Sequence, residues 1–254
     1  MKIRVTSTTN LIAFLKKLKM IDRSVLLELK ENKLFSKVHT PDKSVMKYAS
    51  IDNTSIFDPI EDWSDSVSSD RIKMGIMDVG RLMDCFKHFR PEEDIFLELS
   101  LQDVDEETVA TELKVLSASL SIRIKCADLS LLSYVDDNIL GIVHSKEGQD
   151  AMFRIYNSDF TSIDALCGLE SNSQELLTFE FHEDHVIAFG DSFRFKLNIG
   201  KSDIEVDSEM KASIYKSQLN YVDSESYTVY VHDNRMVLFS DQSETSTAVG
   251  LIEK

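Results

Sequence analysis

The stretch that decides the fold reads TNLIAFLKKLK over residues 9–19 and SVLLELKENKLF over residues 24–35. Its first part places apolar residues every three or four positions, which is the spacing of one face of an α-helix. Its second part has apolar residues typical of strands on both sides of the polar run Glu31, Asn32 and Lys33, which predicts two strands joined by a turn. A helix that leads directly into a β-hairpin indicates an α+β unit.

The same order of elements occurs again further along the chain. The hairpin pattern at 28–34 matches that at 180–186, and a helix precedes each one. The four helices that we expect lie at about 8–22, 78–89, 158–169 and 211–223, among many short strands. We therefore expect an α+β fold of two similar domains with antiparallel sheets and two helices each. The expected boundaries are 1–127 for the N-terminal domain, 128–140 for the connector and 141–254 for the C-terminal domain.

Composition and charge exclude several classes of protein. Of the 254 residues, 43% are hydrophobic and only 3 are proline, so the chain can form a real core and is not a disordered tail. The net charge is -16, which excludes a protein that grips DNA with its whole surface, because such a surface must neutralise phosphates. Contact with nucleic acid requires the few cations to be gathered in one place.

The cysteines and the terminus indicate a reducing compartment. Cys85, Cys126 and Cys167 are odd in number and far apart, so we expect neither disulfides nor a zinc site. The opening MKIRVTSTTN lacks the apolar run of a signal peptide, and no run of apolar residues reaches the length that spans a membrane. We expect a protein that is not secreted.

Cations gather on the first expected helix. Its apolar face carries Leu11, Phe14, Leu15, Leu18 and Ile21. Lys16, Lys19 and Arg23 lie almost opposite, with Lys17 at the border. The second helix turns Arg81 and Lys87 away from its apolar stripe, and the fourth offers Lys211 and Lys216, whereas the third has no lysine or arginine.

Two interpretations of these cations are open. They are either ordinary solvated helix faces or a shared surface that meets phosphates. The enrichment of cations within so acidic a chain favours the second interpretation. It is physically possible because the Debye length at physiological salt is about 8 Å, so acidic residues on a distant face repel DNA weakly. Phosphate contacts of this kind carry no sequence information and permit sliding.

In its order of elements and its placement of cations, the chain resembles DNA sliding clamps. In layout it is similar to the trimeric clamps of tailed bacteriophages, and in plan to proliferating cell nuclear antigen. The residues that carry the resemblance are the helix and hairpin at 9–35, Asp78–Phe86 before Ile95–Leu99, Phe153–Phe160 at the start of the second half, and the final strand Thr247–Ile252. The resemblance covers nearly the whole chain and lies in layout rather than in an invariant motif.

The resemblance implies a homotrimeric ring, with helices lining the hole, that encircles duplex DNA and tethers a DNA polymerase. An ATP-driven clamp loader is the further partner, and no catalysis, metal, cofactor or membrane is involved. The implied DNA-binding residues are Lys16, Lys17, Lys19, Arg23, Arg81, Lys87, Lys211 and Lys216. The implied pocket for partner peptides comprises Val38, His39, Val45, Leu131, Leu132, Tyr134, Leu251 and Ile252. The implied location is the cytoplasm of an infected bacterium for a phage protein, or the nucleus for a eukaryotic one.

Other motifs in the sequence indicate functions other than that of a clamp. Tyr134-Val135-Asp136-Asp137 copies the metal-binding hairpin of reverse transcriptases, so Asp136 and Asp137 are alternative Mg²⁺ ligands of a polymerase fragment. That chemistry needs a third, upstream carboxylate and a basic template channel. The runs His182–His185 and Asp103–Glu107 are weak candidates for a transition metal and for Ca²⁺. A scaffold of the same fold that does not bind DNA is the remaining alternative.

Overall fold

The computed structural model describes the chain in two compact units. One unit comprises Met1–Pro41 with Lys47–Val135, and the other comprises Asp42–Met46 with Asp136–Lys254. The expected connector 128–140 is thus divided between the two units. The structure describes all residues except 61, 62, 64–66, 91, 133, 139, 140, 142–147, 170–175, 207, 208, 224, 225, 233, 234, 242–244 and 252–254.

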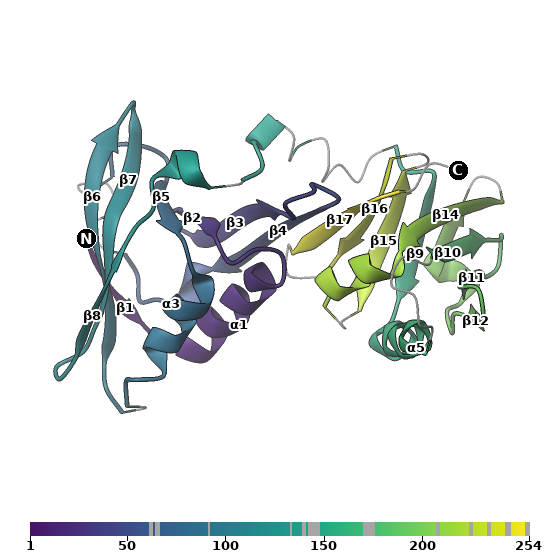
Figure 1. Cartoon of the computed structure of the whole chain (residues 1–254), viewed down its shortest axis with the longest axis horizontal. Helices are drawn as coiled ribbons and strands as arrows, with labels where there is room; N and C mark the ends of the chain where they lie inside the picture. The colour runs from purple at the N-terminus through teal and green to yellow at the C-terminus, as the bar shows by residue number, and fades with distance from the viewer. Residues whose placement is uncertain are drawn as a thin grey trace. The chain divides into compact units, whose positions relative to one another are not determined.

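The first unit is a twisted sheet, and among its described residues the helices α1 and α3 lie on one face of it (Figure 1). The strands run in the order β1-β6-β7-β5-β2-β3-β4, and β8 also pairs with β7. β5 and β7 are parallel, whereas β2–β3 and β6–β7 are antiparallel hairpins. The elements are β1 (Lys2–Val5), α1 (Thr8–Lys19), β2 (Val25–Leu29), β3 (Lys33–His39), β4 (Val45–Asp52), β5 (Ile72–Ile76), α3 (Val79–Phe86), β6 (Ile95–Val104), β7 (Glu107–Leu116) and β8 (Ser121–Lys125).

Both helices of this unit begin at a capping side chain. The Ser7 hydroxyl accepts a hydrogen bond from the Asn10 amide, and the Asp78 carboxylate accepts one from the Arg81 amide. Such caps satisfy amides that have no partner within the helix, and each is worth about 1 kcal/mol. The caps fix where α1 and α3 begin, and therefore which side of each helix faces the sheet.

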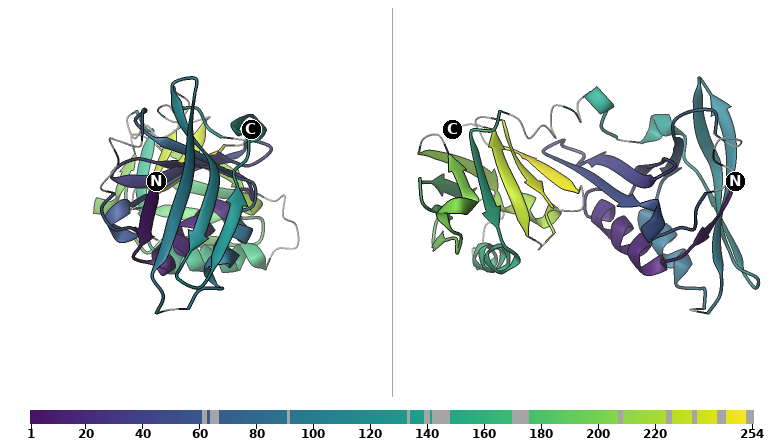
Figure 2. Two further views of the ribbon diagram at one scale, coloured as in Figure 1. Left: turned by 90° about the vertical axis from the view of Figure 1, so that its left-hand side faces the viewer. Right: turned by 180° about the vertical axis from the view of Figure 1, so that it is seen from behind.

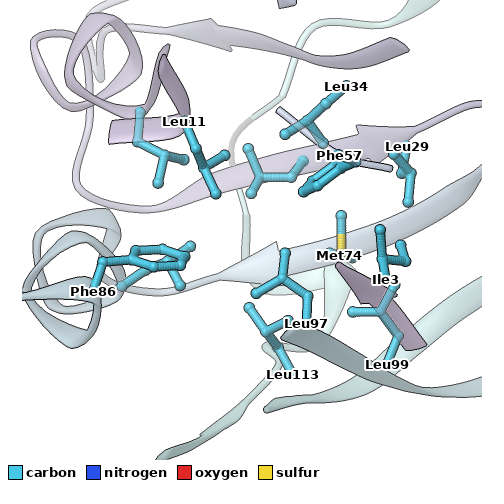
Figure 3. Close-up of a pocket in the computed structure, with 13 residues that line it drawn as sticks. Ile3, Leu11, Leu29, Leu34, Phe57, Met74, Phe86, Leu97, Leu99 and Leu113 are labelled. Atoms are coloured by element: carbon cyan, nitrogen blue, oxygen red, sulfur yellow. The ribbon is translucent and has the colours of Figure 1, made fainter. Parts of the chain in front are cut away.

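The helices and the sheet enclose a dry core. Figure 3 shows Leu11 of α1 and Phe86 of α3 pointing toward Leu97 and Met74 of the sheet. The remaining cavity is about 30 Å³ and is lined entirely by apolar side chains. A cavity of this size without polar partners does not retain an ordered water. This interior is therefore packing, and it is not a ligand site.

The second unit repeats the opening order of the first. It contains the sheet β17-β16-β15-β9-β13 and the sheet β12-β11-β10-β14. Phe153 packs against Phe179 and Phe181, and Phe160 of α5 packs against Phe239. The elements are β9 (Ala151–Ile155), α5 (Asn157–Gly168), β10 (Leu176–Phe181), β11 (Val186–Phe189), β12 (Arg194–Lys196), β13 (Ile204–Val206), β14 (Met210–Tyr215), η4 (Lys216–Tyr221), β15 (Tyr227–His232), β16 (Met236–Ser240) and β17 (Ser246–Gly250).

The α+β fold expected from the sequence is confirmed, with two corrections. The sheets are not wholly antiparallel, because β5 pairs with β7 in parallel. The helix expected at 211–223 is wrong, because Met210–Tyr215 forms β14 and only Lys216–Tyr221 turns, as a 3-10 helix. β14 pairs with β10 along its whole length, from Leu176 opposite Tyr215 to Phe181 opposite Met210. This pairing joins segments far apart in the sequence, and it overrides the helical spacing of the local apolar residues.

The thiol of Cys126 is buried at the end of β8, with 8% of the residue exposed. Burial raises the pKa of this thiol to about 11. Because the thiolate is the reacting form, we expect Cys126 to react slowly with a disulfide reagent in the native protein at pH 8. Mass spectrometry of the labelled peptide measures this, with protein unfolded in urea as the control. Rapid labelling of native Cys126 would contradict the expectation.

Candidate nucleic-acid interface

α1 and α3 lie side by side in the first unit (Figures 1 and 2). α1 buries Leu11, Phe14, Leu15 and Leu18 against the sheet, and α3 buries its apolar stripe in the same way. The sides of the two helices that face away from this core carry the cations. The α1–α3 surface, as we name it, comprises Lys16, Lys17, Lys19, Arg23, Arg81 and Lys87.

The structure places Lys16, Lys17, Lys19 and Arg81 on two adjacent helices, with Arg23 in the turn after α1 and Lys87 directly after α3. Lys16, Lys19, Arg23, Arg81 and Lys87 are exposed, and Lys17 is half-buried. A Cβ atom placed on Gly80 would lie 3.2 Å from the Lys19 Nζ atom and 3.1 Å from Asp78 Oδ1. The ammonium group of α1 therefore reaches the first turn of α3, which makes the cations of the two helices one continuous surface.

Two carboxylates of α3 lie within this surface. Asp78 pairs with Arg23, and this hydrogen bond, together with that from the Arg81 amide, lowers the pKa of Asp78. Asp84 pairs with Lys87 at 2.7 Å, which lowers the pKa of Asp84. Both carboxylates therefore stay ionised at neutral pH. They offset two of the six cations and orient Arg23 and Lys87.

The surface nevertheless remains positive. With Asp22, Asp78 and Asp84 all counted against the six cations, the formal charge is +3 in a chain of net charge -16. Among the described residues, neither Lys16 nor Arg81 forms an ion pair, so their charges face solvent. Exposed cations on two parallel rows can contact phosphate oxygens without reading bases. The arrangement therefore fits the backbone of a nucleic acid.

Lys211 and Lys216 belong to the second unit, and neither lies on an exposed face of an α-helix. Lys211 lies on strand β14 and pairs with Glu180 at 2.9 Å. Lys216 is only 6% exposed, and desolvation lowers the pKa of its ammonium group. The expectation that these two lysines project from a DNA-facing helix is wrong, because the segment is a strand followed by a buried 3-10 turn.

The residues expected to bind partner peptides fall into different environments. Val38 and Val45 are completely buried, His39 is buried with its Nδ1 atom 2.7 Å from the Thr40 carbonyl, and Leu132 is buried as well. These four are accounted for by packing. Leu131 and Tyr134 are exposed, with 70% and 43% of each residue accessible. Leu251 is half-buried. Ile252 lies outside the described residues.

The alternative metal sites find little geometric support. Asp136 and Asp137 are exposed, and Asp136 accepts a hydrogen bond from the Asn138 amide, as in a polar turn. The described part of the chain contains no group of three His, Cys, Asp or Glu side chains placed to hold a metal ion. The rings of His182 and His185 stack 4.4 Å apart rather than converging on a common point.

Asp103 has a structural role that the sequence did not reveal. Its carboxylate accepts hydrogen bonds from the hydroxyls of Ser68 and Thr108 at 2.6 and 3.0 Å. The bond from Ser68 is the main reason that the pKa of Asp103 is lowered. Ser68 is 35 residues away in the sequence, so no local pattern predicts this partner. The acidic hairpin is thereby joined to the loop before β5.

Comparison with known proteins identifies the fold. No protein-family model matches the sequence, and no curated protein matches it. Among solved structures, it is similar to proliferating cell nuclear antigen of A. fulgidus, solved with the C-terminal region of FEN-1 bound. The TM-score is 0.71 with 14% identity, covering 100% of this chain and 99% of that one. Proliferating cell nuclear antigen of Entamoeba histolytica gives 0.70 with 10% identity, covering 99% and 98%.

The chain therefore has the fold of a sliding clamp. The resemblance inferred from the sequence is confirmed, in particular the similarity to proliferating cell nuclear antigen along the whole chain. No helix in the described part of the chain is long and apolar enough to cross a membrane.

Proposed function

We propose that this protein is a DNA sliding clamp that encircles duplex DNA and tethers the replicative DNA polymerase to its template. The observation that carries the proposal is the α1–α3 surface, where six lysines and arginines of an acidic chain lie together on or directly after two helices of a clamp fold. The protein acts as a scaffold and not as an enzyme. It needs neither a metal nor a cofactor for this role.

In such a mechanism, encirclement by a closed ring keeps the protein on DNA in place of tight binding. Contacts between lysine or arginine and phosphate are independent of sequence and exchange quickly, so the duplex can slide past the surface. Retention on DNA then depends on closure of the ring. An ATP-driven loader must open the ring, because a closed ring cannot reach DNA without ends. The site of action is the cytoplasm of an infected bacterium or a nucleus, where such a polymerase and loader work.

Self-association into a homotrimeric ring is supported by open strand edges. Among the described strands, β8 pairs only with β7, and β12 pairs only with β11. An open edge favours pairing with another chain, and closure into a ring removes it. We expect a mass of about three times 28.9 kDa by light scattering at high protein concentration, falling on dilution. A monomeric mass at every concentration would contradict the ring.

Leu131 and Tyr134 are the residues that we retain for partner binding. They are large, exposed side chains close together in sequence, and the similar A. fulgidus protein was solved with a partner segment bound. We expect Leu131→Ser with Tyr134→Ser to reduce stimulation of the cognate polymerase by about tenfold, which is the loss of one apolar anchor in an interface. Binding to linear duplex DNA serves as the control and stays unchanged. Full stimulation by the variant would contradict this assignment.

A further inference from the structure

The negative charge of this protein is distributed unequally between its two units. The first unit has 18 lysines and arginines against 21 aspartates and glutamates, which gives -3. The second has 10 against 23, which gives -13. Four-fifths of the excess negative charge therefore belongs to the second unit. This difference raises the question of whether both units can meet the same polyanion in the same way.

α5 is the counterpart of α1 in the second unit. It follows β9 and precedes the β10–β11 hairpin, as α1 follows β1 and precedes the β2–β3 hairpin. Its apolar side buries Phe160 and Ile163. The exposed side carries Ser158, Thr161, Asp164 and Ala165. The helix therefore offers hydroxyl groups and one carboxylate where α1 offers lysines.

The neighbouring element η4 adds no exposed cation to α5. Its lysine, Lys216, is withdrawn from solvent, and burial lowers the pKa of its ammonium group. Ser217 and Asn220 are the exposed polar residues of η4. Within α5 and η4, no lysine or arginine faces solvent; the exposed Lys201 lies on a separate short 3-10 helix, η3 (Lys201–Asp203). The affinity of a protein for duplex DNA rises with the number of cations that displace counterions. The exposed sides of α5 and η4 therefore add nothing to the affinity for DNA.

We propose that each subunit binds duplex DNA through one surface only, the α1–α3 surface. The exposed side of α5 faces the same duplex but does not bind it, because Asp164 repels the phosphates; we call this side of α5 the gap. This inference rests on the proposed clamp function and deepens it. Contacts around the duplex are then unequal, with one positive and one negative patch per subunit. A gap of this kind weakens the hold on DNA and favours sliding over static binding.

A gain of binding tests the inference, because misfolding cannot produce it. In the full chain, Asp164→Lys is compared with Glu205→Lys, which adds the same charge to an exposed residue of β13. Glu205 lies opposite Met152, on the sheet face away from buried Phe153. The probe is a fluorescein-labelled linear duplex, titrated by anisotropy over a salt series. We expect Asp164→Lys to tighten binding and steepen the plot of log K against log salt by about 0.9, with Glu205→Lys unchanged.

A loss experiment completes the test. We expect Ser158→Ala with Thr161→Ala to leave DNA affinity within about twofold of wild type, because neutral hydroxyls displace no counterions. An equal loss in this variant and in Lys16→Glu with Arg81→Glu would overturn the inference, since α5 would then be a contact. No gain from Asp164→Lys would also overturn it, since α5 would not face DNA. If Lys16→Glu with Arg81→Glu changes nothing, the proposed function itself fails.

Discussion

We expect reversal of Lys16 and Arg81 to glutamate to abolish tethering to DNA and to leave the fold intact. Both residues are exposed and form no ion pair within the described part of the chain, so the change removes two phosphate contacts and adds two repulsive charges. We expect DNA affinity to fall by at least about tenfold and the salt slope to fall by about 1.8. Synthesis on primed circular DNA by the cognate polymerase and loader measures the consequence as a collapse in product length.

The choice of residues keeps this experiment interpretable. Arg23 is left in place because it pairs with Asp78, the capping residue of α3, and its reversal would disturb the helix. The control is Lys2→Glu with Arg154→Glu, which changes the net charge by the same amount. Both residues are exposed, and each lies next to buried residues on a strand. We expect the control to support synthesis like the wild type. Normal product length with the Lys16 and Arg81 variant would rule out the α1–α3 surface as the DNA contact.

Replacement of Glu28 by alanine should cause the largest loss of stability. Glu28 is 1% exposed, and its carboxylate lies 2.9 Å from the Lys37 ammonium and 2.8 Å from the Arg71 guanidinium. Lys37 is itself only 4% exposed. The truncation leaves a buried cation without its carboxylate partner, which costs about 3–5 kcal/mol. Since Lys37 sits on β3 and Glu28 on β2, the hairpin that opens the fold loses its internal ion pair.

Urea unfolding followed by circular dichroism measures this loss. Glu98→Ala is the matched control, because Glu98 pairs with Lys114 at a site where 38% of its side chain is exposed. Exposed pairs of that kind contribute about 0–1 kcal/mol. The double change Glu28→Met with Lys37→Met should recover most of the stability, because it removes both buried charges together. A Glu28→Ala variant as stable as the Glu98→Ala variant would show that the buried pair contributes little.

Local patterns in the sequence were sufficient for much of the fold. The helix expected at about 8–22 spans Thr8–Lys19, and the first of the two strands expected within 24–35 spans Val25–Leu29. Periodicity predicts these elements because the spacing of apolar residues along a short segment marks the side of the helix or strand that is buried. The cations of α1 and α3 were found for the same reason, since a residue opposite an apolar stripe must face solvent.

The features of the fold that local patterns did not predict depend on contacts with residues that are distant in the sequence. Met210–Tyr215 is a strand because β10 pairs with it, and Lys216 is buried in the 3-10 helix that follows this strand. Glu28 looks like a surface residue in an alternating strand, yet residues from β3 and the start of β5 enclose it. The sequence by itself determined which segments are amphipathic and where the charges lie along each. Only the tertiary structure decided which faces are covered, because burial and ion pairing are set by contacts between segments that no local period encodes.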